Sequence, residues 1–156
     1  MIAVDASIAV KWYLHEPFSE EAIAVLTMDE KLVAPSLAIY EVAGAFVRAR
    51  RRGDIDETDL ADCISRWNLA IESRVVSLEQ ELQDVLRASE LAVSIGHPLA
   101  DCVYLAMAER LNAPLVTADA VFCDKLGSQF PFVHFVADLS PIGNAVSEIA
   151  HHSKTA

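Results

Sequence analysis

Residues 1–10 read MIAVDASIAV, a short apolar run that passes through a single acid, Asp5, into a second apolar run. The first run, Ile2 to Val4, has the length of a buried strand. The second begins a helical pattern near Ser7 that extends to Leu14. A buried strand that leads directly into a helix is the unit from which parallel α/β sheets are built. This stretch therefore predicts an α/β fold.

The rest of the chain repeats this alternation of short apolar runs and helical patterns. Gly53 and Gly96 follow two of the helical patterns, where glycine commonly ends a helix, and Ser19 is a plausible helix cap. Because the strands are short and apolar, we expect one domain with a mostly parallel sheet of about five strands, covered by helices on both faces. We predict strands at 2–4, 32–34, 74–78, 114–117 and 132–136, and helices at 7–14, 18–28, 36–52, 79–95, 98–111 and 120–126, with a further helix that begins at 56 or 58 and includes 71. Residues 1–140 are expected to form this domain, and 141–156 a C-terminal helix or tail.

Composition and charge exclude several classes of protein. Of the 156 residues, 53% are hydrophobic and 22% are charged, which excludes a disordered acidic tail. The formal charge of −11 means that a nucleic acid would need local basic residues or a bound cation. Three cysteines at wide spacing predict neither a disulfide framework nor a zinc site. No stretch is apolar enough to span a membrane, and the start has no signal-peptide pattern, so we expect a soluble cytoplasmic protein.

Four acids, Asp5, Glu41, Asp101 and Asp119, each stand alone in an otherwise uncharged stretch. Because a lone buried carboxylate is costly, such groups pair, protonate or bind metal. Asp5 and Asp119 each follow a predicted strand, at the edge where ligands bind to open parallel sheets. Asp101 lies in the first turn or so of its helix, and Glu41 lies more than one turn into its own. The placement predicts that the four carboxylates converge.

Each acid also has a purely structural interpretation. Asp5 and Asp119 fit helix N-caps, and Asp101 fits an acid that compensates a helix dipole. Glu41 fits a solvated helix face. Taken together, however, the four favour a shared divalent cation. Carboxylates without His or Cys select Mg²⁺ or Mn²⁺, and less often Ca²⁺. Because Mg²⁺ binds phosphates readily, such a site suggests phosphodiester hydrolysis.

Five short motifs resemble the PIN-domain family and, more narrowly, the VapC-type toxins of toxin–antitoxin pairs. The resemblance extends from Ile2 to about Leu139, and it rests on the order and spacing of the motifs because none is specific alone. The motifs are VDAS (4–7), VKW (10–12), IYEV (39–42), LAD (99–101) and TADAVF (117–122).

The resemblance implies a three-layer α/β/α sandwich and a Mg²⁺- or Mn²⁺-dependent endoribonuclease, in which a carboxylate-bound metal activates water. By position, Asp5, Glu41, Asp101 and Asp119 match the catalytic, metal-binding acids of the family. Ser7 and Thr117 match its hydroxyls beside the metal site. The resemblance also implies an RNA substrate, a homodimer and a VapB-type antitoxin that inhibits the enzyme.

Arg48, Arg50, Arg51 and Arg52 form the only dense basic patch in the sequence. We interpret it mainly as a set of cations that compensates a helix dipole, with contact to RNA phosphates or a partner as the alternative. Lys11 is expected to pair with a surface acid, or alternatively to reach a phosphate.

Other residues are expected to serve the fold. We leave His97 out of the site because lone histidines more often cap or pack. The mean hydropathy of +0.30 predicts exposed apolar surface that meets a second subunit or the antitoxin. The aromatic residues expected in the core or in a dimer contact are Trp12, Tyr13, Tyr40, Trp67 and Tyr104.

Two other functions compete with the nuclease. A non-catalytic PIN-like module that binds RNA or a partner has no use for four unpaired acids. A phosphatase that uses an aspartyl nucleophile would carry a second Asp two residues after the first, where this chain has Ser7, and a receiver would need adjacent acids near the end of the first strand. The sequence therefore favours the metal-dependent endoribonuclease.

Overall fold

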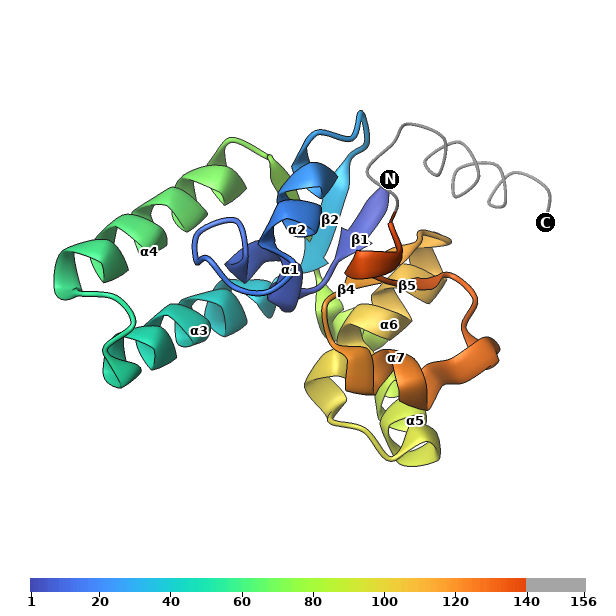
Figure 1. Ribbon diagram of the computed structural model, residues 1–156. Helices are drawn as coiled ribbons and strands as arrows, with labels where there is room; N and C mark the ends of the chain where they lie inside the picture. Colours follow the sequence, from blue (N-terminus) through green and yellow to red (C-terminus); the bar gives the residue numbers. More distant parts are fainter. Residues whose placement is uncertain (140–156) are drawn as a thin grey trace.

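The structure is a computed structural model that describes residues 1–139 (Figure 1). Its centre is a five-stranded sheet in the order β3-β2-β1-β4-β5, in which every neighbouring pair is parallel. The predicted α/β fold with a parallel sheet is confirmed, and all five strands overlap the predicted ranges. The strands are β1 (Ile2–Val4), β2 (Leu32–Pro35), β3 (Val76–Glu79), β4 (Leu115–Thr117) and β5 (Val133–Phe135).

The helices form one layer on each side of the sheet. Figure 1 shows α1 to α4 on one side and α5, α6 and α7 on the other. This division follows from right-handed crossovers, because the chain moves across the sheet in one direction from β1 to β3 and in the opposite direction from β3 to β5. The helices are α1 (Ala6–Val10), α2 (Ser19–Leu26), α3 (Ala38–Arg52), α4 (Glu57–Glu72), α5 (Val85–Ile95), α6 (Leu99–Leu111) and α7 (Ala120–Leu126), with short 3₁₀ turns η1 (Glu81–Asp84), η2 (Gly127–Gln129) and η3 (Val136–Asp138).

Helix ends follow local sequence at several predicted positions. Gly53 and Gly96 end α3 and α5 with positive φ angles of 82° and 67°, a conformation that glycine adopts without steric cost. Asp56 caps α4 by accepting a hydrogen bond from the Asp59 N–H, and the Asp59 side chain accepts one from the Asp56 N–H in return. The predicted boundaries at these three positions are confirmed.

The predicted helix from Glu79 to Ile95 is wrong in its first third. Glu79 belongs to β3, the short turn η1 follows, and α5 begins only at Val85. A tertiary contact explains the difference: Asp84 is buried, and its carboxylate accepts a hydrogen bond of 2.7 Å from Arg110 Nε on α6. A buried carboxylate needs this partner, so the contact overrides the local helical pattern.

Two predictions near the N-terminus also need correction. The first helix ends at Val10 and not at Leu14, and a turn follows it. Ser19 is the first residue of α2 and not its cap. The Ser19 hydroxyl instead accepts a hydrogen bond from the Glu16 N–H and donates one to the Leu14 carbonyl, so it holds the loop before α2.

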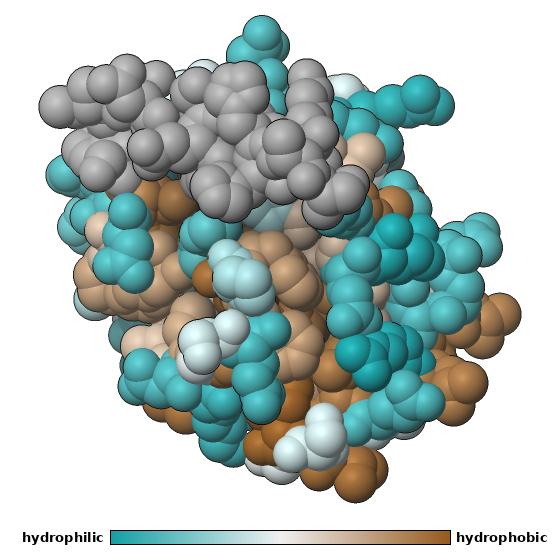
Figure 2. Space-filling view, turned by 90° about the vertical axis from the view of Figure 1, so that its right-hand side faces the viewer, coloured by the Kyte–Doolittle hydropathy of each residue, from teal (hydrophilic) through white to brown (hydrophobic). Residues whose placement is uncertain are grey.

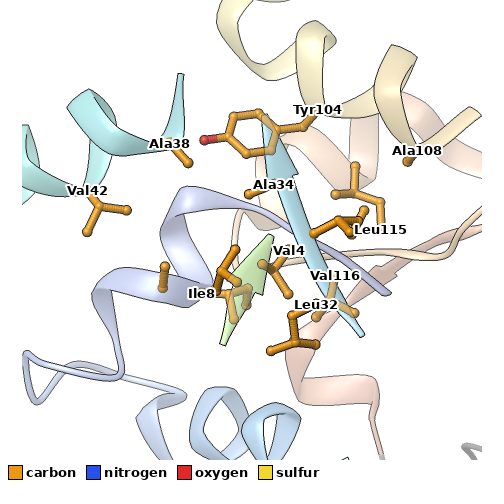
Figure 3. Close-up of a cluster of buried hydrophobic side chains, with 14 of the residues drawn as sticks. Val4, Ile8, Leu32, Ala34, Ala38, Val42, Tyr104, Ala108, Leu115 and Val116 are labelled. Carbon is orange, nitrogen blue, oxygen red and sulfur yellow. The ribbon is translucent and has the colours of Figure 1, made fainter. Parts of the chain in front are cut away.

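The core lies on both faces of the sheet, and α6 is its most buried helix. Every residue from Cys102 to Ala108 is buried, and Tyr104 is among the largest fully buried side chains. Figure 3 shows Tyr104 and Ala108 close to the sheet residues Ala34 and Leu115. Because the central strands β1, β2 and β4 and the middle of α6 are buried, they form a rigid support for side chains at the carboxyl edge of the strands.

Exposed apolar side chains occur in particular on η1 and α5. Leu82, Leu86 and Val93 are 83%, 74% and 85% exposed. Figure 2 shows apolar surface between polar side chains on the face that lies to the right in Figure 1. Tyr40, expected in the core or in a dimer contact, is 76% exposed and therefore is not a core residue. The predicted exposed apolar surface is thus present in the described part of the chain.

No single helix within residues 1–139 is long and apolar enough to cross a membrane. The segments Leu82–Ile95 and Leu99–Leu111 meet that test of length and composition only as a pair, bent by 119°. All three cysteines are free. The helix or tail expected beyond residue 140 lies outside the described residues.

Candidate active site

The carboxyl ends of β1 and β4 mark the point where the strand order reverses. β2, the next strand in the sequence, pairs with β1 on one side, and β4 pairs with β1 on the other side. Open parallel sheets bind ligands at this position because the adjacent crossovers leave a crevice there. Asp5 directly follows β1, and Asp119 lies two residues beyond the end of β4. Both acids are therefore placed at the crevice by the topology.

All four predicted acids line one pocket with a volume of about 300 Å³. Asp5 and Asp119 come from the sheet edge, Glu41 from α3 and Asp101 from α6, so four elements contribute. Glu41 lies in the first turn of α3, not more than one turn in as expected, because the helix begins at Ala38. Asp101 lies in the first turn of α6, as predicted.

Asp5 is held by two hydroxyl groups, one from a residue two positions away and one from a residue 112 positions away in the sequence. Ser7 Oγ and Thr117 Oγ1 donate hydrogen bonds of 2.6 and 2.7 Å to Asp5 Oδ2. Thr117 is fully buried, and Ser7 Oγ also accepts a bond of 3.0 Å from the Ala118 N–H. Asp5 occupies the N-cap position of α1, as the structural interpretation predicted, but its carboxylate makes no capping hydrogen bond to that helix. Ser7 and Thr117 orient the carboxylate, which is consistent with their predicted positions.

Glu41 is held by Tyr104, a buried residue of α6. The Tyr104 hydroxyl donates a hydrogen bond of 2.6 Å to Glu41 Oε2, and the Tyr104 side chain is 1% exposed. Figure 3 shows the hydroxyl oxygen of Tyr104 directed toward α3. Sequence analysis placed Tyr104 in the core and missed this contact. The sequence holds one signal of this contact: Tyr104 lies three residues after Asp101, on the same face of the predicted helix.

Asp101 lies beside His97, the histidine that sequence analysis left out of the site. His97 Nε2 is 2.9 Å from Asp101 Oδ2, a distance that gives an ion pair when the ring is protonated. The ring also stacks on Phe122 with centroids 4.5 Å apart. Neither ring nitrogen has a hydrogen bond of good geometry within the described chain. His97 is therefore a packed residue that also neighbours a site carboxylate.

Asp119 has a structural role as well as a place in the pocket. Its Oδ1 accepts a hydrogen bond of 2.9 Å from the Phe122 N–H, which caps α7. The N-cap interpretation is thus correct for Asp119, and the carboxylate lines the pocket at the same time. Lys11, also in the pocket, pairs with Glu16 at 2.8 Å.

Burial and mutual repulsion disfavour the ionised form of three of these acids. Burial raises the pKa of Asp5, and the nearby Asp119 charge raises it further, against the two hydroxyl hydrogen bonds. Burial also raises the pKa of Glu41, as do the charges of Asp5 and Asp101, while the Tyr104 bond lowers it. Burial again is the main cause that raises the pKa of Asp101, together with Asp5 and Asp119. A cation in this pocket would relieve the repulsion.

The four carboxylates of the pocket are chemically suited to bind a divalent cation. Carboxylate oxygens are the ligands that Mg²⁺ and Mn²⁺ prefer, and the pocket offers four. Within residues 1–139, however, no three Asp, Glu, His or Cys side chains form a cluster compact enough for a ready-made metal site. Three of the carboxylates accept hydrogen bonds from protein groups, and the fourth, Asp101, lies against His97. Binding of an ion would therefore require some of these side chains to move.

Residues 2–125 match the PIN domain. The match covers most of the chain, which therefore belongs to the PIN-domain family. Within this family it is 30% identical over 125 residues to Ribonuclease VapC3 of Pyrobaculum aerophilum, an alignment that covers 80% of this chain and 93% of that protein. It is 32% identical over 133 residues to Ribonuclease VapC9 of Mycobacterium tuberculosis, with 84% of this chain and 95% of that protein covered.

A solved structure supports the fold. A chain of a toxin–antitoxin complex from Klebsiella pneumoniae superposes with a TM-score of 0.62 and covers 91% of this chain and 98% of its own length. The sequence identity is 15%, so the likeness concerns the fold alone. The sequence-based resemblance to the PIN-domain family is confirmed.

Proposed function

We propose that this protein is a metal-dependent endoribonuclease, a VapC-type toxin that hydrolyses RNA phosphodiester bonds and is neutralised by a VapB-type antitoxin. The observation that carries the proposal is the convergence of four carboxylates from four elements on one pocket at the sheet edge. The names of the relatives, which are VapC ribonucleases, support the assignment of RNA as the substrate.

In this proposal Asp5, Glu41, Asp101 and Asp119 hold Mg²⁺ or Mn²⁺. When bound, such an ion supplies positive charge for the scissile phosphate and lowers the pKa of water. Ser7 and Thr117 fix the Asp5 carboxylate by donating to one of its oxygens. Tyr104 fixes Glu41 in the same way and limits its rotation. Hydrogen-bond partners of this kind orient ligands and strengthen metal binding.

The partners follow from the same assignment. The exposed apolar side chains of η1 and α5 are a surface that a second copy or the antitoxin would cover, since contiguous apolar patches mark interaction sites. We propose a homodimer, which the family resemblance implies. We also propose a cytoplasmic location, which the three free cysteines favour. Residues 1–140 form the nuclease domain in this proposal.

A second candidate is a non-catalytic PIN-like module that binds RNA or a protein. The observation in its favour is that the carboxylates lie against protein groups and form no compact metal cluster among the described residues. Such a module would keep the pocket but would need no cation.

RNA cleavage by repurified protein separates the two candidates. The nuclease should cleave in Mg²⁺ or Mn²⁺, stop in EDTA and recover when metal is restored. Asp5→Asn, purified in parallel, should remain inactive and so controls for contaminating nuclease. Full cleavage in EDTA would contradict the metal dependence, and no cleavage of cellular RNA under any of these conditions would favour the binding module.

A further inference from the structure

The pocket has a basic end as well as an acidic one, and α3 joins the two. Four α3 residues line the pocket at intervals of three or four residues, which is the spacing of one helix face. They are Glu41, Ala45, Arg48 and Arg52. An acid, a small residue and two arginines therefore follow each other along the helix away from the sheet edge.

Helix geometry separates these arginines from their neighbours. At 3.6 residues per turn, Arg48 and Arg52 each lie within about 20° of Glu41 around the axis of α3. Arg50 lies about 180° away by the same measure, and Arg51 about 80° away. Neither Arg50 nor Arg51 lines the pocket. The basic patch thus divides into one pair that faces the pocket and one pair that does not.

The local contacts leave the pocket-facing pair available to a ligand. Arg48 forms no salt bridge with the described residues. Its Nη1 lies over Gly44, 3.4 Å from the position that a Cβ would take there, so the glycine gives the guanidinium room beside the helix. Among the described residues Arg52 pairs only with Asp54, and both side chains are more than half exposed, which makes a weak contact.

We propose that Arg48 and Arg52 form a phosphate-binding stripe that holds the RNA backbone where it leaves the acidic end of the pocket. The proposal rests on the proposed function, since it names residues that bind the same substrate. Arginine is suited to this task because its planar guanidinium makes paired hydrogen bonds to phosphate oxygens. A chain with a formal charge of −11 repels RNA elsewhere, so a local stripe would also fix the direction of the strand.

The chain supplies its own matched control. Arg48→Gln/Arg52→Gln and Arg50→Gln/Arg51→Gln remove the same charge from the same helix, and glutamine keeps a good helix propensity. Each double variant is made in the Asp119→Asn protein, so that the RNA is not cleaved. Binding of a short fluorescein-labelled single-stranded RNA is then measured by anisotropy over a series of salt concentrations, with circular dichroism as a check of folding.

We expect the Arg48/Arg52 variant to bind the RNA roughly tenfold more weakly at low salt. Its slope of log K against log salt should fall by about 1.4, because each phosphate contact on a single strand contributes about 0.7. The Arg50/Arg51 variant should bind like the parent. Equal losses in the two variants would show only a general charge effect and would overturn the proposal, as would unchanged binding in both.

Two further outcomes identify what failed. If the Asp119→Asn parent itself binds no RNA, the proposed function fails together with the stripe. In the second outcome, the parent and the Arg48/Arg52 variant bind RNA equally well, but the same two changes in the otherwise wild-type toxin prevent neutralisation by its co-expressed antitoxin. The stripe is then a protein contact, and the RNA proposal is wrong.

Discussion

The two ends of the pocket differ in how firmly the fold holds their side chains. At the sheet edge, Asp5 accepts hydrogen bonds from two hydroxyls, and Glu41 accepts one from a buried tyrosine. At the far end, Arg48 and Arg52 stand on an exposed helix face with one weak ion pair between them and the rest of the described chain. Rigid placement suits chemistry that depends on geometry, while exposed cations suit attraction to a flexible polyanion. The acidic end should therefore control turnover and the basic end affinity.

The largest expected effect is the loss of activity at the acidic end. Glu41→Gln keeps the shape of the side chain and an acceptor for Tyr104, but it removes one negative charge from the site. Cleavage should fall by about 10²–10³-fold, a usual cost of losing one electrostatic group. Expression of the wild-type chain alone should arrest bacterial growth, and Glu41→Gln should relieve the arrest at equal protein level.

Growth curves and immunoblots from one promoter check this prediction, with Asp119→Asn as a second variant. Equal arrest by all three proteins would point to aggregation or sequestration as the cause of toxicity. No arrest by the wild type in several hosts would favour the non-catalytic module.

A smaller effect is expected from the residue that positions Glu41. Tyr104→Phe removes one oxygen from a buried side chain and leaves the ring packing in place. Mn²⁺ affinity and activity should each fall by about 10- to 100-fold, as happens when hydrogen-bond partners of metal ligands are removed. Isothermal titration with Mn²⁺ measures the affinity directly. An unchanged Mn²⁺ affinity in a folded Tyr104→Phe protein would limit Tyr104 to a packing role.

The third prediction concerns the free energy of unfolding without metal. The raised pKa values of Asp5, Glu41 and Asp101 mean that the folded state binds more protons than the unfolded state above the ordinary carboxyl pKa, 3.8 for Asp. These groups therefore make stability fall as pH rises from that value through the raised pKa. In EDTA at neutral pH, Asp101→Asn should melt at the same temperature as the wild type or higher.

Thermal melts over a pH series check the sign. The Asp101→Asn protein should show a weaker decline of stability with rising pH than the wild type. A loss of several degrees at neutral pH, with aggregation, would instead show that the Asp101 carboxylate stabilises the fold through His97 and the helix dipole.

The smallest effect is expected at the arginines outside the pocket. Arg50→Gln/Arg51→Gln removes two cations from the last turn of α3, where they complement the helix dipole. The cost should be about 0.3–1 kcal/mol for each cation at low salt and less at high salt. Urea unfolding at two salt concentrations measures it. A larger loss in the Arg48/Arg52 variant than in this one would mean that the pocket-facing pair also stabilises the fold.

The fold was predictable because local and tertiary preferences agree in most of the chain. The buried strands β1, β2 and β4 are almost wholly apolar, and Gly53, Gly96 and Asp56 end or begin helices by local backbone chemistry. The one large error, the helix assigned from Glu79, arises where Asp84 pairs with Arg110 at a separation of 26 residues. A contact at that distance in sequence leaves no periodic signal.

The same distinction applies to the candidate site. The acids were found because each interrupts an uncharged stretch, and topology then brings their elements to one edge. Tyr104 was missed as a partner because 63 residues separate it from Glu41 and because tyrosine in an apolar helix fits the core equally well. The division of the arginines into two pairs depends on which face of α3 lines the pocket, which the sequence alone does not specify.

A crystal structure of the protein grown with Mn²⁺, with anomalous diffraction recorded at the manganese edge, tests the central claim most directly. The proposal predicts an anomalous peak in the pocket with carboxylate oxygens of Asp5, Glu41, Asp101 or Asp119 as ligands, and no such peak in Asp5→Asn. A well-ordered pocket without manganese, or manganese bound only elsewhere, would contradict the assignment of these four acids as the metal site.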